Sequence, residues 1–275
     1  MPEITVLVDN TPFANLESEH GLSFWIDYNG RHILFDTGQT DMIGRNAKKI
    51  GIDLSLTDAI ILSHGHYDHT GGIPSVLKST GKPAVYMHPR ATETKYSRKP
   101  NRIKMVGMSD RVKESIDFLT LKCKIVKTEK PTEVLPGFSV TGQIPRKTTF
   151  EDTGGDFYLD QSCTVPDLVP DDQAAWFDTD NGLVVILGCA HSGVVNTLDY
   201  ISSLTGRKKI HALVGGMHLV NASPERVKFT IEAIEKYGIE QIGPAHCTGS
   251  EATRKIKDAF EEKYFECHAG LKKTF

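Results

Sequence analysis

The sequence lacks the features that mark membrane proteins, disulfide-rich secreted proteins and nucleic-acid-binding proteins. None of its apolar runs approaches the roughly 20 residues that are needed to span a bilayer. Its five cysteines are odd in number, widely scattered and never in a CxxC pair, so we expect free thiols in a reducing compartment. The net charge of −3 gives no general attraction to nucleic acid or to an anionic membrane.

The beginning of the chain also lacks the pattern of a secretion signal. The residues MPEITVLV have no basic region followed by an apolar stretch, and we interpret them as a first strand. A chain of 275 residues with 24% charged and 39% hydrophobic residues can bury a full core and has an ordinary globular composition. We therefore expect a soluble, cytoplasmic protein of the size of an enzyme.

The first third of the chain alternates between predicted strands and helices. Strands are expected over 4–8, 22–28 and 32–35, and the pair Asn29-Gly30 predicts a hairpin between the last two. A helix is expected over 41–50, with Gly51 as its C-terminal cap. A strand over 58–63, a short helix from Gly72 and a strand over 84–87 follow.

The last third returns to the same alternation. Strands are expected over 182–188, 210–214 and 239–242. Ser192 is the predicted N-cap of a helix to about residue 204, Ser223-Pro224 begins a helix that ends at Gly238, and Ser250 begins the final helix. The pattern predicts one α/β domain over 1–275, a four-layer αββα sandwich of two mixed sheets flanked by helices.

The middle of the chain, 90–172, has weak periodicity and is rich in Lys, Arg, Thr, Pro and Gly. We interpret it as an irregular insertion that is a lid over a site, a dimer contact in a homo-oligomer, or neither, and the sequence does not separate these three. Its basic run, 95–104, is open to two interpretations. It is either a solvated loop or a rim that binds an anionic substrate.

Three histidines and an aspartate lie within the six-residue run HGHYDH at 64–69. The run follows the apolar segment 58–63, so its side chains are expected at the carboxyl end of a strand. Residues at such an end are held rigidly while one side stays open to solvent. Neutral imidazole and carboxylate suit zinc, iron or manganese. The alternative, loop histidines with no common function, requires four ligand-type residues to coincide by chance.

Two further histidines follow apolar strands in the same way. His191 lies in GCAHSG after the strand at 182–188, and His246 lies in PAHCTG after the strand at 239–242. Each alone could be a structural histidine. Strand ends on one rim of a sandwich can converge on a single pocket, so the two histidines are candidate ligands together with the first run.

These motifs resemble the metallo-β-lactamase superfamily of metal-dependent hydrolases. The resemblance rests on His-x-His-x-Asp-His at 64–69, on the two later His motifs and on FDTG at 35–38, and it covers nearly the whole chain. It implies two divalent ions, zinc above all, with Fe²⁺, Mn²⁺ or Mg²⁺ as alternatives. The implied ligands are His64, His66 and His191 for one ion and Asp68, His69 and His246 for the other. Asp36 would orient ligands from behind.

The sequence departs from the superfamily at one position. Members with two metals usually carry a bridging aspartate after the strand at 210–214, where this chain has Met217 and His218. His218 is therefore a candidate ligand, a candidate acid or base, or a buried structural residue. The surrounding motifs and TGQIPR at 141–146 resemble the branch named after 7,8-dihydropterin-6-methyl-4-(β-D-ribofuranosyl)aminobenzene-5′-phosphate synthase.

The resemblance implies a hydrolase that uses a metal-activated hydroxide on a small, polar, phosphate-containing ester. Asp68 would orient the attacking water, and Arg146 would bind the anionic substrate. The alternative is a transferase that joins a dihydropterin diphosphate to a ribofuranosylaminobenzene phosphate and releases diphosphate. Nucleic-acid cleavage, electron transfer at a di-iron centre and a purely structural metal site are weaker alternatives. Cys189 and Cys247 are interpreted as small packing residues, with thiol ligation or redox sensing as the alternative.

Overall fold

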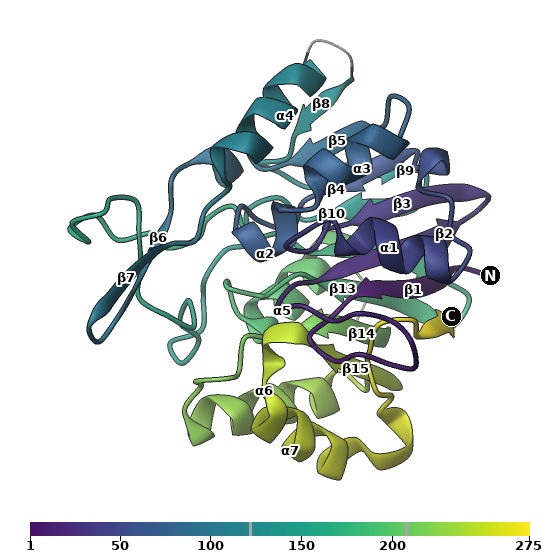
Figure 1. The fold of residues 1–275 in the computed structure, drawn as a ribbon. Coiled ribbons are helices and arrows are strands. Elements are labelled where there is room, and N and C mark those ends of the chain that lie inside the picture. The colour runs from purple at the N-terminus through teal and green to yellow at the C-terminus, as the bar shows by residue number, and fades with distance from the viewer. Residues whose placement is uncertain (121–122, 207–208) are drawn as a thin grey trace.

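The computed structural model contains two large β-sheets packed face to face, with helices on both outer sides (Figure 1). It describes residues 1–120, 123–206 and 209–275. The strand order is β16-β1-β2-β3-β4-β5-β8 in the first sheet and β15-β14-β13-β12-β10-β9 in the second. Each sheet combines parallel and antiparallel pairs. The predicted four-layer α/β sandwich is confirmed.

The strands of the first sheet are β1 (Glu3–Val8), β2 (Ser23–Tyr28), β3 (Arg31–Phe35), β4 (Ala59–Ile61), β5 (Ala84–Met87), β8 (Ile125–Lys127) and β16 (Lys272–Thr274). Those of the second are β9 (Thr132–Leu135), β10 (Phe138–Val140), β12 (Ala175–Thr179), β13 (Gly182–Leu187), β14 (Ile210–Gly216) and β15 (Gln241–Ala245). A small third sheet contains β6 (Tyr96–Lys99), β7 (Arg102–Met105) and β11 (Phe157–Tyr158).

The helices are α1 (Met42–Lys49), α2 (Tyr67–Thr70), α3 (Ile73–Ser79), α4 (Asp110–Thr120), α5 (Val194–Thr205), α6 (Pro224–Lys236) and α7 (Ser250–Phe260). The described residues also contain four short 3₁₀ turns: η1 (Leu54–Leu56), η2 (Pro89–Thr92), η3 (His246–Thr248) and η4 (Glu261–Lys263). None of the described helices is long and apolar enough to cross a membrane.

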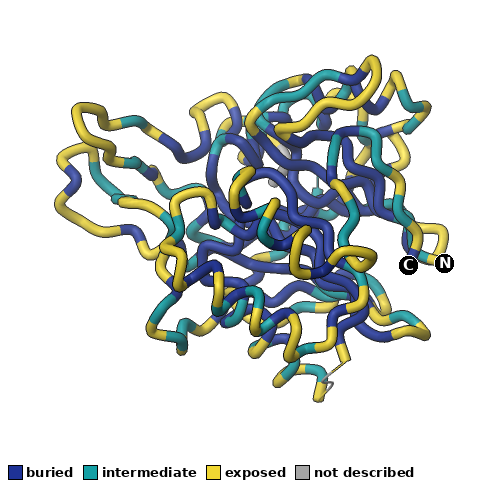
Figure 2. The backbone as a smooth tube through the Cα atoms, turned by 90° about the horizontal axis from the view of Figure 1, so that it is seen from below, coloured by how far each residue is buried: buried dark blue, intermediate teal, exposed yellow. Residues whose placement is uncertain are grey.

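Three apolar cores hold the four layers together. The core between the sheets includes the fully buried rings of Phe24, Phe138 and Phe177. A second core lies between the first sheet and α1, α3 and α4, and a third lies between the second sheet and α5, α6 and α7. Figure 2 shows the buried backbone at the centre and exposed loops at the edges. Because both of its faces are covered, β13 is buried along its whole length.

The predicted hairpin forms between β2 and β3. Asn29 and Gly30 both have positive φ angles, 51° and 74°, as a two-residue type I′ turn requires. The prediction of α6 also holds, because the Ser223 side chain accepts a hydrogen bond from the Arg226 backbone N–H. The neighbouring strand β15 starts at Gln241 rather than at 239.

The N-cap predicted for α5 is wrong. Gly193 occupies the N-cap position, and the Ser192 side chain does not cap the helix. Instead the Glu151 carboxylate accepts hydrogen bonds from the backbone N–H groups of Val195 at 2.8 Å and Asn196 at 2.9 Å. A Cβ on Gly193 would lie 2.2 Å from the Glu151 side chain, so this long-range cap requires glycine there.

The segment 90–172 is more regular than predicted. It contributes β8 to the edge of the first sheet and β9 and β10 to the edge of the second, and it contains α4. The hairpin β6–β7 projects from the body of the protein at the left of Figure 1, and β11 pairs with β6. The hairpin is largely exposed and not packed on a core, which accounts for its weak hydrophobic pattern. A role as a lid or dimer contact stays a prediction.

Candidate metal centre

Five loops that follow strands supply the candidate site. The pairs β3–β4, β13–β14 and β14–β15 are parallel, so the carboxyl ends within each set lie at the same edge of the sheet. Asp36 follows β3, the run 64–69 follows β4, and His191, His218 and His246 follow β13, β14 and β15. The structure brings all six predicted ligands together at this edge.

The first three predicted ligands form a compact group of rings. The ring centroids of His64 and His66 are 4.5 Å apart, and each lies 4.8 Å from that of His191. The His64 Nε2 and His66 Nδ1 atoms are 2.9 Å apart. Two donor atoms on one tetrahedral zinc lie about 3.3 Å apart when both are nitrogens, so this spacing is close to that of a metal site.

The other three predicted ligands, Asp68, His69 and His246, lie beside the first three. The Asp68 Oδ2 atom is 3.4 Å from His246 Nε2 and 4.0 Å from His69 Nε2. The rings of His69 and His246 are 5.0 Å apart, and the ring of His69 is 4.3 Å from that of His64. The two groups therefore form one continuous cluster.

Asp36 fixes the histidines of the first motif from behind. Its fully buried carboxylate accepts hydrogen bonds from His69 Nδ1, the Ser63 hydroxyl and the Ser63 backbone N–H, each at 2.7 Å. Because the Ser63 hydroxyl donates to Asp36, its oxygen accepts from His64 Nδ1 at 2.9 Å. The protons of His64 and His69 are thus placed on Nδ1, and both Nε2 lone pairs face the cluster.

The two later histidines are oriented in the same way. His191 Nδ1 donates to the Thr153 carbonyl at 2.7 Å, and His246 Nδ1 donates to the Asn10 side-chain oxygen at 2.8 Å. His246 has a positive φ of 49°, and its backbone N–H donates to Asp9 at 2.8 Å. Both Nε2 atoms are buried and, within the described residues, have no hydrogen-bond partner.

These donor atoms fit divalent metal ions. Burial holds the pKa of His64, His66 and His191 well below the ordinary value, so these imidazoles stay neutral as ligands must. Burial also disfavours charge on His69, but the Asp36 carboxylate outweighs it and raises the pKa of His69 to about 9. On metal binding the Nε2 proton of His69 leaves, and the Asp36 carboxylate makes the remaining imidazole a more basic ligand.

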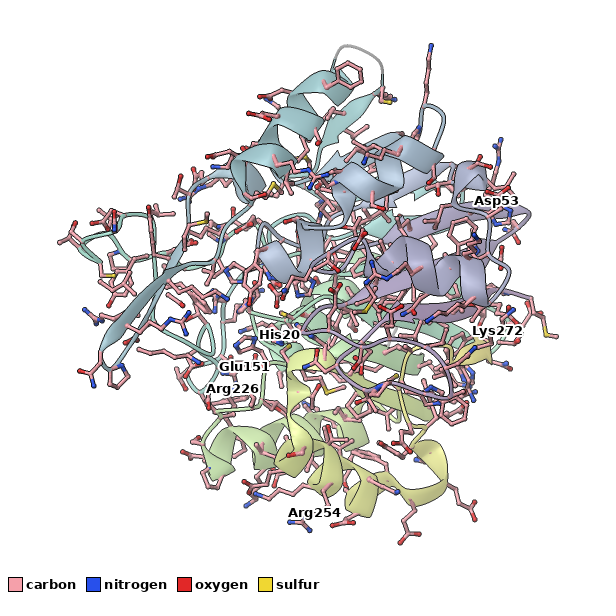
Figure 3. All side chains as sticks on the ribbon, viewed as in Figure 1. His20, Asp53, Glu151, Arg226, Arg254 and Lys272 are labelled. Carbon is pink, nitrogen blue, oxygen red and sulfur yellow. The ribbon has the colours of Figure 1, made fainter. Side chains whose placement is uncertain are left out.

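A residue that the sequence prediction missed contacts Asp68. His20 Nε2 lies 3.0 Å from the Asp68 carboxylate, and the His20 ring lies 4.8 Å from that of His246. Burial would raise the pKa of Asp68, but the neighbouring His20 and His246 side chains hold it well below the ordinary value. His20 lies in the loop between β1 and β2, at the centre of Figure 3, and no sequence motif marks it.

Two cysteines belong to the cluster as well. Cys189 Sγ lies 3.1 Å from His69 Nε2, and the donor atoms of Cys189, Cys247 and His218 all lie within 4.8 Å of one another. The His218 ring is 4.3 Å from that of His191, and its Nδ1 is buried without a partner among the described residues. His218 thus lies against the ligands, not behind them.

The cluster lines a cavity of about 830 Å³. His66, Asp68, His191, His218 and His246 contribute to its wall. The lining also contains part of the basic run, from the hairpin β6–β7, and the loop around β11: Ser97, Arg98, Lys99, Pro100, Lys104 and 152–157. This arrangement favours the interpretation of the basic run 95–104 as the rim of the cavity that binds an anionic substrate.

One lysine of the basic run has a structural role instead. Lys95 is fully buried, and its Nζ atom donates to Asp167 at 2.9 Å and to Asp171 at 2.8 Å. The other carboxylate oxygen of Asp171 accepts from the Gly65 backbone N–H at 2.8 Å. The base of the hairpin is therefore connected through Asp171 to the loop that carries His64 and His66.

Arg146, the predicted substrate ligand, lies outside the lining of this cavity. Its guanidinium donates to the carbonyls of His191 at 2.7 Å and Leu168 at 2.8 Å, and it lines a neighbouring cavity of about 390 Å³. Burial lowers its pKa from the ordinary value. Arg146 supports the backbone of a predicted ligand in this structure, and direct substrate binding by it stays a prediction.

The family model described as the metallo-beta-lactamase superfamily matches residues 18–198, which include the whole first motif and His191. The chain belongs to the metallo-β-lactamase superfamily. It is 34% identical to the 7,8-dihydropterin-6-methyl-4-(beta-D-ribofuranosyl)-aminobenzene-5′-phosphate synthase of Methanocaldococcus jannaschii, over 95% of this chain and 90% of that protein. The resemblance to this branch of the superfamily is thereby confirmed.

Solved structures of the superfamily have the same fold. A metal-dependent hydrolase of the β-lactamase superfamily is 31% identical, with a TM-score of 0.85 over 100% of this chain and 99% of the other. A diphosphatase from the PhnP family has a TM-score of 0.60 at 14% identity, over 100% of this chain and 98% of that one. The second likeness shows the fold alone. The chain is an enzyme of this fold, with residues suited to divalent metal ions.

Proposed function

We propose that this metallo-β-lactamase-fold enzyme is a hydrolase of a small, anionic, phosphate-containing ester. The observation that carries the proposal is that much of the ligand cluster lines the same cavity as three cationic side chains, Arg98, Lys99 and Lys104. Metal ions held by the cluster would act on the bond that is cleaved, and the cations would bind a phosphate group of the substrate.

Two zinc ions are the proposed cofactors. His64, His66 and His191 would hold one, and Asp68, His69 and His246 would hold the other. Neutral imidazoles with one carboxylate are the ligands that zinc takes in catalytic sites. When bound, such ions polarise a phosphoryl oxygen and lower the pKa of water to about 7.

Asp68 is the proposed residue that orients the attacking water. Its carboxylate is buried and stays ionised at neutral pH, because His20 and His246 hold its pKa low. A carboxylate in that state accepts a hydrogen bond and can direct the lone pair of water toward the substrate. His20, which is half exposed and contacts Asp68, connects this position to solvent.

The hairpin β6–β7 is the proposed phosphate-binding wall. Lys104 Nζ donates to the Tyr67 hydroxyl at 2.7 Å and lies 3.9 Å from the centre of the Tyr67 ring. The Arg98 guanidinium lies over the Tyr158 ring at 4.7 Å. These contacts hold two cations at the cavity before substrate arrives, which reduces the entropy lost on binding.

His218 is the proposed proton donor to the leaving group. Its ring lines the cavity beside His191, and one ring nitrogen lacks a partner within the described residues. A positioned imidazole of this kind accelerates bond cleavage by roughly 10²- to 10⁴-fold.

The synthase reaction is the second candidate, favoured by 34% identity to the M. jannaschii synthase over 95% of this chain. In that reaction, an arene carbon of a ribofuranosylaminobenzene phosphate would attack a dihydropterin diphosphate, and diphosphate would leave. The same cations would bind the phosphates. The two candidates differ in the nucleophile, which is water in the hydrolase and an arene carbon in the synthase, and the synthase also requires an acceptor.

One assay separates the two candidates. Metal-analysed protein, purified anaerobically, receives a dihydropterin diphosphate with and without the acceptor, and diphosphate release is followed. Hydrolysis predicts release without acceptor, whereas the synthase predicts release only with it. If diphosphate is released in neither case, a panel of phosphate esters is tested next. Failure to hydrolyse any of these esters would contradict the proposed hydrolase.

The phosphate-binding wall has its own test. Lys104→Ala should raise KM for the substrate roughly 10-fold or more, because a hydrogen bond to a charged group contributes about 1.5–3 kcal/mol. Lys257 on α7 is a matched control, since its Nζ lies 5.5 Å from the centre of the Tyr264 ring and it is not part of the cavity lining. An equal effect of Lys257→Ala, or none in Lys104→Ala, would contradict this role.

A further inference from the structure

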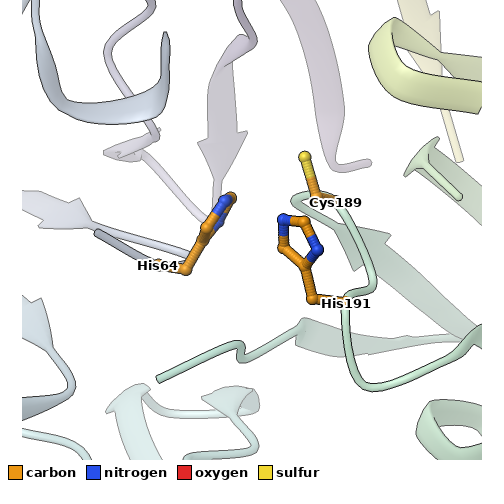
Figure 4. A group of neighbouring side chains, drawn as sticks. All are labelled: His64, Cys189 and His191. Atoms are coloured by element: carbon orange, nitrogen blue, oxygen red, sulfur yellow. The ribbon is translucent and has the colours of Figure 1, made fainter. Parts of the chain in front are cut away.

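Cys189 occupies a position that both ligand groups share. Its Sγ atom, His64 and His191 form one group of donor atoms within 4.8 Å, and Sγ, His69 and His246 form a second. Figure 4 shows the thiol next to the His191 ring, with the His64 ring across from them. Cys247 belongs to neither of these groups.

The unpartnered nitrogens around Cys189 point to a ligand rather than to simple packing. The Nε2 atoms of His191 and His246 are buried and make no hydrogen bond among the described residues, and a donor nitrogen of each ring lies within 4.8 Å of Cys189 Sγ. The thiol itself is buried, at 2% exposure. Buried polar nitrogens are rarely left without a partner, so two of them beside one thiol indicate that all three bind a common ligand.

The end of β14, where related two-metal sites carry their bridging aspartate, offers no such ligand. Gly216 leaves no room for a side chain, since a Cβ there would lie 2.7 Å from Cys247 Sγ. Met217 is fully buried in the core beneath α5, α6 and α7. His218, with a positive φ of 45°, lies beside His191 at one end of the cluster.

We propose that Cys189 is a metal ligand whose thiolate bridges the two ions, in place of the missing carboxylate. This inference rests on the metal centre of the proposed function, but not on its substrate. The 3.1 Å between Cys189 Sγ and His69 Nε2 is near the roughly 3.5 Å that separates sulfur and nitrogen on one tetrahedral zinc.

A thiolate at this point changes which metals the site prefers. It supplies the single negative charge of an aspartate, but as a soft ligand that selects zinc or iron over magnesium and manganese. On binding, the thiol proton leaves to solvent and the sulfur lone pairs form the bonds to metal. The chain should therefore retain zinc against a large excess of magnesium.

X-ray absorption of the zinc-loaded protein tests the ligand directly. The wild-type protein should show zinc–sulfur scattering at about 2.3 Å beside nitrogen and oxygen ligands. Cys189→Ser should lose the sulfur contribution and bind zinc at least about 10-fold more weakly. Cys247→Ser is the matched control, because it removes a buried thiol of the same cluster and should keep the sulfur signal.

Each outcome has a distinct meaning. Zinc bound by nitrogen and oxygen alone in the wild type, or sulfur scattering that persists in Cys189→Ser, would overturn the inference while leaving the metal centre intact. Failure of the wild type to bind zinc would overturn the proposed function as well. If Cys189→Ser does not fold, a sulfur signal that persists in Cys247→Ser assigns the ligand, and its loss there overturns the assignment.

Discussion

Replacing Asp36 with asparagine should weaken metal binding without unfolding the protein. Asp36 is fully buried and accepts three hydrogen bonds of 2.7 Å, two from Ser63 and one from His69 Nδ1. Its φ of 59° lies in the left-handed region, which asparagine tolerates. The substitution therefore changes the hydrogen bonding and leaves the backbone unstrained.

The expected loss of metal affinity follows from the hydrogen-bond acceptors that the side chain at position 36 offers. Asparagine keeps one acceptor oxygen but places an NH₂ donor where the other oxygen meets His69 Nδ1–H. To accept from that amide, His69 must move its proton to Nε2, the nitrogen that faces the cluster. Loss of such supporting partners costs about 10- to 100-fold in metal affinity, which is about 1.4–2.7 kcal/mol.

The fold should survive the same change. One buried hydrogen bond lost costs about 1–3 kcal/mol, against a total stability of about 5–15 kcal/mol for a typical domain. Alanine is the wrong choice here, because it would leave three buried donors without an acceptor.

The assay is a zinc titration in competition with a coloured chelator, with thermal melting alongside. Asp53→Asn is the control, since Asp53 caps η1 at the surface, far from the cluster in Figure 3. Asparagine is as good a cap, so zinc affinity should not change. A folded Asp36→Asn variant that binds zinc as tightly as the wild type would refute the assigned role of Asp36.

Three further predictions concern other parts of the site. Asp68→Ala should stay folded and lose about 10²- to 10⁴-fold in kcat, and unchanged turnover would exclude its role with water. Lys95→Met should cost about 3–5 kcal/mol in a denaturant titration, because it leaves Asp167 and Asp171 buried without their cation; a smaller cost would mean that the ion pair is not essential. Burial raises the pKa of Asp172 to about 6, so its contribution to stability is complete below pH 4 and declines by roughly 3 kcal/mol as the pH rises through 6. Asp172→Asn should flatten that decline, and an unchanged pH profile of the melting temperature would contradict it.

Local patterns predicted the elements that carry their own signals. Asn29-Gly30 encodes its turn through two positive φ angles, and Ser223-Pro224 encodes a helix start, so both follow from adjacent residues. The run at 64–69 predicted ligands because its spacing places them around one turn of chain after β4. Parallel pairing places the ligand loops of each sheet at one edge, and the packing of the two sheets brings the six proposed ligands together.

Contacts between distant parts of the chain were not predictable in this way. Glu151, more than 40 positions earlier in the sequence, caps the start of α5 in place of Ser192. Nothing in the sequence near Ser192 indicates this contact. His20 reaches Asp68 from an irregular loop. Arg146 was expected at substrate because it is basic, but the packing directs its guanidinium to the carbonyl of His191.

The central claim is that the cluster at the carboxyl ends of β4, β13 and β15 binds two divalent ions. Equilibrium dialysis against zinc, with metal analysis of the dialysed protein, tests it most directly. We predict two ions per chain in the wild type and one tightly bound ion when His69 is replaced by alanine. Zinc at trace level in the wild type, or a stoichiometry that His69→Ala leaves unchanged, would contradict it.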